Sequence, residues 1–381
     1  MLCGILSAEH FLLKEGNVLE ERKYMERAIE LARKGAGWTN PNPMVGAVIV
    51  KDGRIIGEGY HEKCGELHAE RNAIAHLTES AEGATIYVTL EPCCHYGKTP
   101  PCTEAIIENK MAKVVIGSRD PNPLVAGKGA RILREAGIEV VEDFMREECD
   151  EVNPVFFHYI TKRRPYVVMK YAMTADGKIA TKTGASKWIT GETSRSLVQI
   201  MRHKYMGIMV GIGTVLADDP MLNVRVPGLK SPTRIICDSN LRIPLDSNIV
   251  KTAKDIRTIV VCANMSEKKF ALEEAGITVV QCSDENDRID LKNLMILLGT
   301  MGIDSILLEG GGTLNYSALR AGIVNEVQMF IAPKIFGGTD AKSPVEGLGV
   351  ELPAEGTMMK YKSMSNIGDD VLIRYIVEEA D

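Results

Sequence analysis

Aromatic residues are scarce in this sequence, at 5% of 381 residues, and basic residues do not outnumber acidic ones. With 45 Lys and Arg against 51 Asp and Glu, the formal net charge is -6. A surface that binds nucleic acid needs a basic face, often with interleaved aromatic side chains. The composition therefore argues against a nucleic-acid-binding protein, although it leaves room for a local basic pocket that holds one phosphate.

Long apolar runs are also absent, since none reaches the ~18 residues of a membrane span, and we expect no membrane association. Residues 1–20 are mildly apolar but lack a basic leader and contain Glu9 and His10. We therefore expect an N-terminal extension and not a signal peptide. Nine cysteines, an odd number and mostly scattered singly, favour a reduced, cytoplasmic protein over a disulfide scaffold. The exception is the cluster of Cys93, Cys94 and Cys102.

Helix-like and strand-like segments alternate along the first 160 residues. Residues 21–35 have apolar residues at helical spacing and end in glycine, and two strand-like runs flank the turn Asp52-Gly53. The alternation predicts an α/β domain with a central sheet. Further helices are expected at 67–77, 102–110 and 129–137, and further strands at 84–90, 113–118 and 138–143.

A basic, proline-ended segment at 162–165 marks the expected domain boundary, after a helix-like stretch from Met145 to Thr161. We expect an extension at 1–20, a first domain at 21–163 and a second at 164–381. Two strand-like runs near the end, 326–332 and 371–379, have no clear helix between them, which predicts a mixed sheet with an antiparallel edge. Other strands of the second domain are expected at 165–172, 207–213, 233–238, 258–263, 277–282 and 305–311.

The most informative residues are His68, Glu70, Cys93 and Cys102. One imidazole and two thiolates suit Zn²⁺ and leave a fourth position open for water. Zinc lowers the pKa of that water towards ~7, and a nearby carboxylate, Glu70, can move its proton to a leaving amine. Hydrolytic deamination needs all of these parts.

A closed structural zinc site is the alternative, with Cys94 or His95 as the fourth ligand. The pairing of His-x-Glu with Pro92-Cys93 is typical of zinc deaminases and favours the catalytic site. The eight residues between Cys93 and Cys102 depart from the usual Cys-x-x-Cys closure. Cys94 follows Cys93 directly and would point the other way in extended backbone.

The segment 89–102 (TLEPCCHYGKTPPC), with 41–53, 59–61 and His-Ala-Glu before it and 120–129 after it, resembles the deaminase half of the bifunctional riboflavin biosynthesis deaminase/reductase family. The resemblance implies a cytidine-deaminase-like three-layer domain, zinc bound by His68, Cys93 and Cys102, and Glu70 as proton shuttle. It also implies substrate contacts from Asn42, His61, His95 and Lys98. Without the resemblance, Asn42 could cap a turn, His61 and His95 could be structural, and Lys98 could be a solvated loop lysine.

The second half lacks a Gly-x-Gly-x-x-Gly fingerprint after a strand, so a Rossmann domain is not indicated. Two glycine-rich turns remain, at 211–214 and 310–313, each after a strand. A glycine turn that opens a helix exposes backbone N–H groups to a phosphate. Many α/β turns need glycine for backbone reasons alone, so nucleotide binding stays an open alternative at this point.

Segments 170–180, 183–190, 210–220 and 307–315 resemble, in that order, the reductase half of the same family. The resemblance implies a dihydrofolate-reductase-like domain that uses NADPH. The implied cofactor contacts are Ala172, Trp188, Thr190, Thr214, Asp218, Gly311, Gly312, Thr313, Leu314 and Asn315. The implied contacts to the ribose phosphate substrate are Ser186, Arg202, Leu222, Arg225 and Glu309.

Each of these residues also has an ordinary structural interpretation. Trp188 could pack in the core, Arg202 and Arg225 could form surface ion pairs, and Asp218 could belong to a turn. Glu309 is harder to explain without a ligand or a partner, because it ends an apolar strand beside glycines. Lys170 and Asp218 are candidates for handling a proton during reduction.

The resemblance implies a small-molecule nucleotide substrate, 2,5-diamino-6-ribosylamino-4(3H)-pyrimidinone 5′-phosphate. Deamination would be followed by hydride transfer to C1′ of the ribose, opened as an imine, which gives a ribityl chain. It also suggests a homo-oligomer. Two alternatives remain: a zinc nucleotide deaminase fused to a non-catalytic binding domain, and a nucleic-acid-binding protein with structural zinc.

Overall fold

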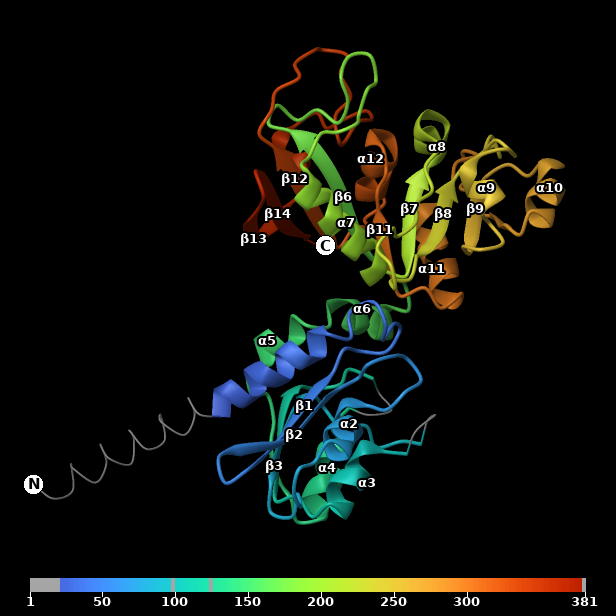
Figure 1. The fold of residues 1–381 in the computed structure, drawn as a ribbon. Helices are drawn as coiled ribbons and strands as arrows, with labels where there is room; N and C mark the ends of the chain where they lie inside the picture. The colour runs from blue at the N-terminus through green and yellow to red at the C-terminus, as the bar shows by residue number, and fades with distance from the viewer. Residues whose placement is uncertain (1–20, 97–99, 123–125, 379–381) are drawn as a thin grey trace, which may run out of the picture. The chain divides into compact units, whose positions relative to one another are not determined.

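The computed structural model describes residues 21–96, 100–122 and 126–378, which form parts of two compact units (Figure 1). The units meet in the sequence between Thr161 and Lys162. Each unit has its own sheet and its own hydrophobic core. Within these residues, no helix has the length and apolarity needed to cross a membrane.

The first unit is built on a five-stranded sheet in the order β2-β1-β3-β4-β5. Strands β1 and β2 form the expected hairpin, with Asp52 and Gly53 at positive φ in the turn. β1 also runs antiparallel to β3, while β3, β4 and β5 are parallel. The strands are β1 Gly46–Lys51, β2 Arg54–Tyr60, β3 Thr85–Leu90, β4 Lys113–Ser118 and β5 Glu139–Val141.

Helices cover both faces of this sheet, because its strands are apolar on both sides. Helices α2 (Ala69–Ala75), α3 (Cys102–Glu108) and α4 (Lys128–Glu135) share one core with Ile49 and Val88. The helix over 21–33 shares the core of the opposite face with Val48. The domain is therefore the three-layer α/β/α fold expected from the sequence.

The stretch 145–161 was expected to be one helix, and this expectation is wrong. It forms two, α5 (Arg146–Asp150) and α6 (Pro154–Lys162). Proline is tolerated in the first turn of a helix and not in its interior, so α6 begins at Pro154. The Asn153 side chain also fixes the break, because it bonds to both the N–H and the C=O of Met44, at 2.8 Å each.

The second unit contains a nine-stranded mixed sheet in the order β10-β9-β8-β7-β11-β6-β12-β14-β13. The seven strands from β10 to β12 are parallel, and β14 and β13 form the antiparallel edge that the sequence predicted. The strands are β6 Tyr166–Thr174, β7 Gly207–Gly211, β8 Thr233–Cys237, β9 Thr258–Cys262, β10 Thr278–Gln281, β11 Ser305–Leu308, β12 Glu326–Ala332, β13 Met359–Ile367 and β14 Asp370–Val377.

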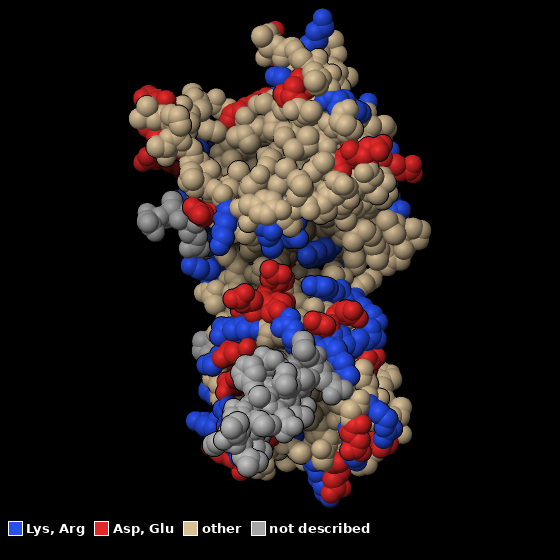
Figure 2. Space-filling model, turned by 90° about the vertical axis from the view of Figure 1, so that its left-hand side faces the viewer, with Lys and Arg blue, Asp and Glu red and all other residues tan. Residues whose placement is uncertain are grey.

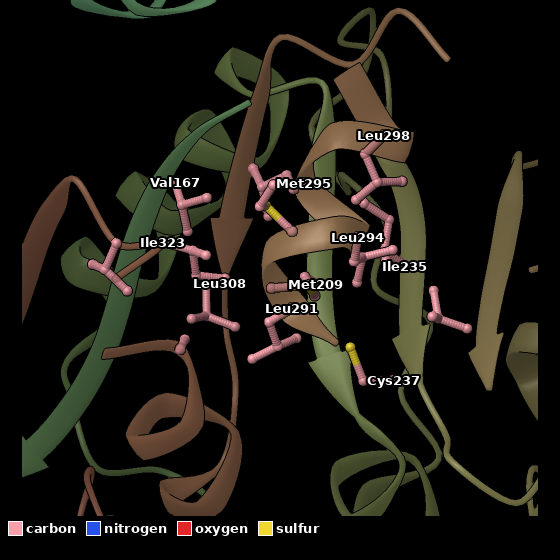
Figure 3. Packing of buried hydrophobic residues seen from close by; sticks show 14 of the residues in the cluster. Val167, Met209, Ile235, Cys237, Leu291, Leu294, Met295, Leu298, Leu308 and Ile323 are labelled. Atoms are coloured by element: carbon pink, nitrogen blue, oxygen red, sulfur yellow. The ribbon is translucent and has the colours of Figure 1, made fainter. Parts of the chain in front are cut away.

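Helix α11 (Leu291–Thr300) packs on one face of this sheet, as Figure 3 shows. Leu291, Leu294, Met295 and Leu298 point from one side of the helix into a core with strands β6, β7, β8 and β11. Their spacing of three and four residues gives α11 its apolar stripe. Helices α8 (Ile212–Asp218), α9 (Asn248–Lys251) and α10 (Lys268–Glu274) fill the core on the opposite face.

The strand order creates a switch point beside β11. From β7 the chain moves outward through β8, β9 and β10, and it then returns to insert β11 between β7 and β6. In open α/β sheets, ligands bind beyond the carboxyl ends of the strands at such a point. Residues that follow β6, β7 and β11 are therefore placed to form a site.

Candidate active sites

Three metal-ligating side chains converge in the first unit. The ligand atoms of His68, Cys93 and Cys102 all lie within 4.8 Å of one another. The Nδ1 atom of His68 is 3.4 Å from Cys93 Sγ and 3.5 Å from Cys102 Sγ. These are the three residues that the sequence predicted as zinc ligands.

Local structure explains the convergence. His68 is the N-cap of α2 and Cys102 is the first residue of α3, so both stand at helix N-termini. Cys93 follows β3, and its sulfur accepts a hydrogen bond from the backbone N–H of Cys102 at 3.4 Å. Hydrogen bonds from Cys102 and from His68 lower the pKa of Cys93. The ready formation of a thiolate suits metal binding.

The donor set fits zinc. One imidazole nitrogen and two thiolate sulfurs are ligands that Zn²⁺ prefers, and three protein ligands leave one position open. Cys94 does not belong to the group of described residues whose ligand atoms converge. Glu70, the second residue of α2, is only 3% exposed. Burial raises the pKa of Glu70, with a further contribution from Cys93.

Asn42 and His61 form a hydrogen-bonded pair near these ligands. The His61 ring is 5.3 Å from the His68 ring, centroid to centroid. His61 Nδ1 lies 2.9 Å from the carbonyl oxygen of Leu67 and its Nε2 lies 3.3 Å from Asn42 Nδ2. Nδ1 therefore donates and Nε2 accepts, and burial lowers the pKa of His61. A neutral His61 orients the Asn42 amide.

The other two expected substrate contacts are less defined. His95 is exposed, and Lys98 lies outside the described residues. The sequence interpretation gave no role to Glu91, whose buried carboxylate accepts hydrogen bonds from the N–H groups of Gly127 and Ala130 at the start of α4. No local spacing links residue 91 to residue 127, so only the structure reveals this contact.

In the second unit, Lys170, Arg202 and Glu309 form a charged cluster whose side chains are only 12–13% exposed. Arg202, from helix α7 (Glu192–Lys204), donates two hydrogen bonds to the Glu309 carboxylate, at 2.8 and 3.0 Å. Lys170 Nζ, from β6, lies 3.9 Å from the same carboxylate. Glu309 directly follows β11, which pairs with β6, so the sheet register brings Glu309 close to Lys170.

The charged groups in this cluster shift the pKa values of one another. Burial opposes ionisation of Glu309, but Arg202 and then Lys170 outweigh it and lower the pKa of Glu309 to about 2. Burial lowers the pKa of Lys170, against the attraction of Glu309. Arg202 thus belongs to an ion pair that is largely shielded from solvent, with only 12% of its side chain exposed, and not to a surface one. Arg202 also donates a hydrogen bond from Nη1 to the carbonyl oxygen of Asn223.

The two glycine-rich turns lie side by side at the ends of β7 and β11. A Cβ added at Gly311 would lie 3.9 Å from Thr214 Oγ1 and would meet no closer atom, and one at Gly213 would meet nothing within 4 Å. Neither residue has a positive φ. Neither packing nor backbone conformation therefore explains these glycines, whereas the close approach of a pyrophosphate to the backbone would.

Other residues of the second turn have structural roles. A Cβ at Gly312 would approach Glu346 Cγ to 2.5 Å, so this glycine permits close packing. Asn315 is fully buried and its Nδ2 donates to the carbonyl of Pro344 at 2.8 Å. Its Oδ1 has no hydrogen-bond partner among the described residues. Thr313 is exposed and Leu314 half-buried at the start of helix α12 (Gly312–Arg320), and this turn fits an NADPH phosphate group.

The loop after β6 carries three more expected contacts. Trp188 is 60% exposed, so the alternative of a core tryptophan is wrong. The Arg195 guanidinium lies over the Trp188 ring, 4.7 Å from its centroid, and the sequence interpretation missed this contact. Ser186 is half-buried and Thr190 is buried.

The remaining expected contacts vary in exposure. Ala172 is half-buried on β6, and Leu222 is buried at positive φ. Arg225 is exposed, as is Asp218 at the end of α8.

Two family models match the chain. Residues 19–118 match the cytidine and deoxycytidylate deaminase zinc-binding region, and residues 165–373 match the RibD C-terminal domain. The first match spans the His68, Cys93 and Cys102 cluster, and the second spans the Lys170, Arg202 and Glu309 cluster.

Relatives match both units together. The riboflavin biosynthesis protein RibD of Actinobacillus pleuropneumoniae is 58% identical over 93% of this chain and 94% of its own length. RibD of Aquifex aeolicus is 45% identical over 93% and 97%. A crystal structure from Thermotoga maritima, of a diaminohydroxyphosphoribosylaminopyrimidine deaminase/5-amino-6-(5-phosphoribosylamino)uracil reductase, is 38% identical with a TM-score of 0.85 and covers 95% of this chain and 100% of its own. The chain belongs to the RibD family, whose members join a zinc-dependent deaminase to an NADPH-dependent reductase in riboflavin biosynthesis.

Proposed function

We propose that the first unit deaminates 2,5-diamino-6-ribosylamino-4(3H)-pyrimidinone 5′-phosphate and that the second reduces the ribose of the product to a ribityl chain. The observation that carries the first step is the convergence of His68, Cys93 and Cys102 beside a buried Glu70. The second step is supported by the charged cluster around Glu309, next to two open glycine turns. We take 21–163 and 164–381 as the two catalytic domains.

In the deaminase, His68, Cys93 and Cys102 would hold zinc, which supplies a water that ionises near neutral pH. Glu70 would take a proton from that water and return it to the leaving amine, so that ammonia departs. Its burial keeps bulk water away from the transfer. Asn42, oriented by His61, would hydrogen-bond the pyrimidine ring, while His95 and Lys98 would complete the contacts.

In the reductase, NADPH would bind at the glycine turns and supply the hydride. Trp188, Thr190, Thr214, Asp218, Ala172 and residues 311–315 would hold it. Arg225 would bind the substrate phosphate, with Ser186, Leu222, Arg202 and Glu309 around the ribose. The hydride adds to C1′ of the opened imine and a proton adds to its nitrogen. Lys170, whose Nζ lies 3.9 Å from the Glu309 carboxylate, is one candidate for donating this proton, and Asp218 is the other.

The test follows ammonia release and NADPH absorbance together with the diaminopyrimidine ribotide, for wild type and Glu70→Gln. Wild type should do both. The variant should lose ammonia release by a factor of about 10²–10⁴ and still reduce deaminated substrate. Ammonia without NADPH oxidation would instead indicate a monofunctional deaminase. If zinc-replete protein neither releases ammonia nor oxidises NADPH, the proposed substrate is wrong.

We also propose that the protein is a homo-oligomer, because one sheet face is apolar and exposed. Register places Tyr361, Met364 and Ile373 on the same face of β13 and β14. Tyr361 is 60% exposed and Met364 61%. Figure 2, seen from the side of these strands, shows a broad surface of this unit with few charged side chains. Homodimer interfaces are typically apolar in this way.

Sedimentation velocity tests this interface. Met364→Glu should yield monomers, because it places a charge on the apolar face. Ser365→Glu on the opposite face of the same strand is the matched control and should sediment as wild type. Equal sedimentation of both variants would contradict the interface.

We place the protein in the cytoplasm, a proposal supported by the free thiols of its eight described cysteines.

A further inference from the structure

Residues 221–225 form a segment without helix or strand between α8 and β8. It carries Leu222 and Arg225, the two proposed substrate contacts of this region. Such a segment has no ladder of backbone hydrogen bonds to fix its conformation, so other groups must satisfy its polar atoms.

Four side chains form hydrogen bonds with the backbone of this segment, each at a different residue. Arg234 Nη1 donates to the carbonyl of Met221 at 3.3 Å, and Arg202 Nη1 donates to the carbonyl of Asn223 at 3.1 Å. The N–H of Val224 donates to Ser231 Oγ at 3.1 Å. The N–H of Arg225 donates to Gln199 Oε1 at 3.0 Å.

The bond to Gln199 is the one that acts directly on Arg225. Gln199 is only 8% exposed and comes three residues before Arg202 on α7, so both side chains lie on one face of the helix. Arg202 is bound in turn to Glu309. A single helix therefore fixes the distance between the Glu309 cluster and the backbone of residue 225.

The Arg225 side chain is exposed. It is not hydrogen-bonded to Glu309 as Arg202 is, but its positive charge also contributes to lowering the pKa of Glu309. A long side chain on an irregular segment has many accessible conformations. Restricting it to one of them on binding costs conformational entropy. Fixing its backbone reduces that cost and limits where the guanidinium can reach.

We propose that Gln199 is a positioning residue of the reductase site, which fixes the backbone at Arg225 and so aims its guanidinium at the substrate phosphate. The inference rests on the proposed function, because the phosphate contact of Arg225 belongs to that proposal. Gln199 itself does not touch substrate. Its effect should therefore depend on both Arg225 and the phosphate.

The experiment compares NADPH oxidation with 5-amino-6-(5-phosphoribosylamino)uracil and with its dephosphorylated form. Gln199→Leu removes the acceptor at similar size. It should raise KM for the phosphorylated substrate about tenfold, the scale of one hydrogen bond, with kcat within about twofold. The dephosphorylated substrate should show the same kcat/KM as with wild type. Gln199→Glu keeps an acceptor oxygen and should restore most of the lost affinity.

Two controls separate positioning from a general structural effect. Gln281→Leu changes a glutamine of β10 whose side chain donates to Ala263, and it should leave KM unchanged. In the background of Arg225→Ala, Gln199→Leu should add nothing, because the two changes remove one interaction. Additive effects, or an equal loss with both substrates, would overturn the positioning role alone. A wild-type KM for Arg225→Ala would overturn the phosphate contact and the inference with it.

Discussion

Cys93 and Cys94 are neighbours in the sequence, yet only Cys93 joins the cluster with His68 and Cys102. We expect Cys94→Ala to keep about one zinc per chain and to keep deamination. Cys93→Ala should lose the metal, because two ligands rarely hold zinc where three are needed. Zinc content by mass spectrometry of the purified proteins, together with ammonia release, measures both. Loss of zinc from Cys94→Ala would instead indicate a closed, four-ligand site.

Lys170 predicts a pH dependence for the reductase. Burial lowers its pKa, so its ammonium should lose the proton below the ~10.4 of an ordinary lysine. If Lys170 supplies the proton, kcat/KM should fall as pH rises through this lowered pKa. Lys170→Arg stays charged throughout, so its profile should be flat over this range, with kcat lower by a factor of about 10² or more. NADPH oxidation from pH 7 to 10 with deaminated substrate measures this.

Unfolding does not explain such a fall in activity. A lysine whose folded pKa lies below its unfolded pKa weakens the fold while it is charged. This penalty shrinks as pH rises from the folded pKa to the unfolded pKa, and it is absent above both. Titration of Lys170 should therefore not destabilise the protein in the alkaline range. Identical pH profiles for wild type and Lys170→Arg would exclude Lys170 as the proton donor.

Two loops of the second unit, 175–190 and 333–342, are joined by hydrogen bonds and lie together beyond the sheet in Figure 1. Asp176 accepts bonds from the N–H groups of Phe336 and Gly337, at 3.1 and 2.7 Å. A hydrogen bond from Thr174, then these bonds, lower the pKa of Asp176 to about 2. The carboxylate therefore remains charged at neutral pH and holds the loop that carries Trp188.

We expect Asp176→Ala to loosen both loops. Proteolytic cleavage in 175–190 should be faster and the KM for NADPH several-fold higher, because the loop must be ordered on binding. Deamination should be unchanged. Asp340→Ala, which removes an exposed carboxylate from the second loop, is the matched control. An unchanged KM and cleavage rate in Asp176→Ala would show that the other bonds between the loops suffice.

Elements with regular apolar spacing could be predicted from the sequence. Most strands of both sheets were expected because their β-branched runs are buried on both faces. β13 was not, since its two lysines and two serines break the apolar pattern and most of it is exposed at the sheet edge. The break before Pro154 was missed although the proline is a signal for it in the sequence. Only the second contact that fixes it, from Asn153 to a residue 109 positions away, needs the structure.

The same distinction applies to the sites. The convergence of His68, Cys93 and Cys102 could be predicted because the pairing of His-x-Glu with Pro-Cys reflects a chemistry that few other patterns serve. Glu91 and Gln199 could not, because each binds backbone N–H groups more than 25 positions away. Such a contact depends on the path of the chain and leaves no signal in residue type. For Trp188 the sequence left core packing open as an alternative, and only the structure excludes it.

At the scale of the whole molecule, the two units have separate sheets and separate cores. The zinc ligands tie together α2, α3 and the segment after β3, so the metal should stabilise the first unit. NADPH should stabilise the second by about 2.7 kcal/mol at a hundred times its Kd. Each ligand should therefore shift the unfolding of one unit only.

Differential scanning calorimetry should resolve two transitions. Removal of zinc with a chelator should lower one of them, in parallel with the loss of ammonia release. NADPH should raise the other, in parallel with protection of reductase activity against heating. Restoring zinc should return the first transition to its original temperature without changing the temperature of the second. This result separates metal loss from general damage by the chelator. A single transition that both ligands move together would mean that the units unfold cooperatively, and each cofactor would then stabilise the activity of both.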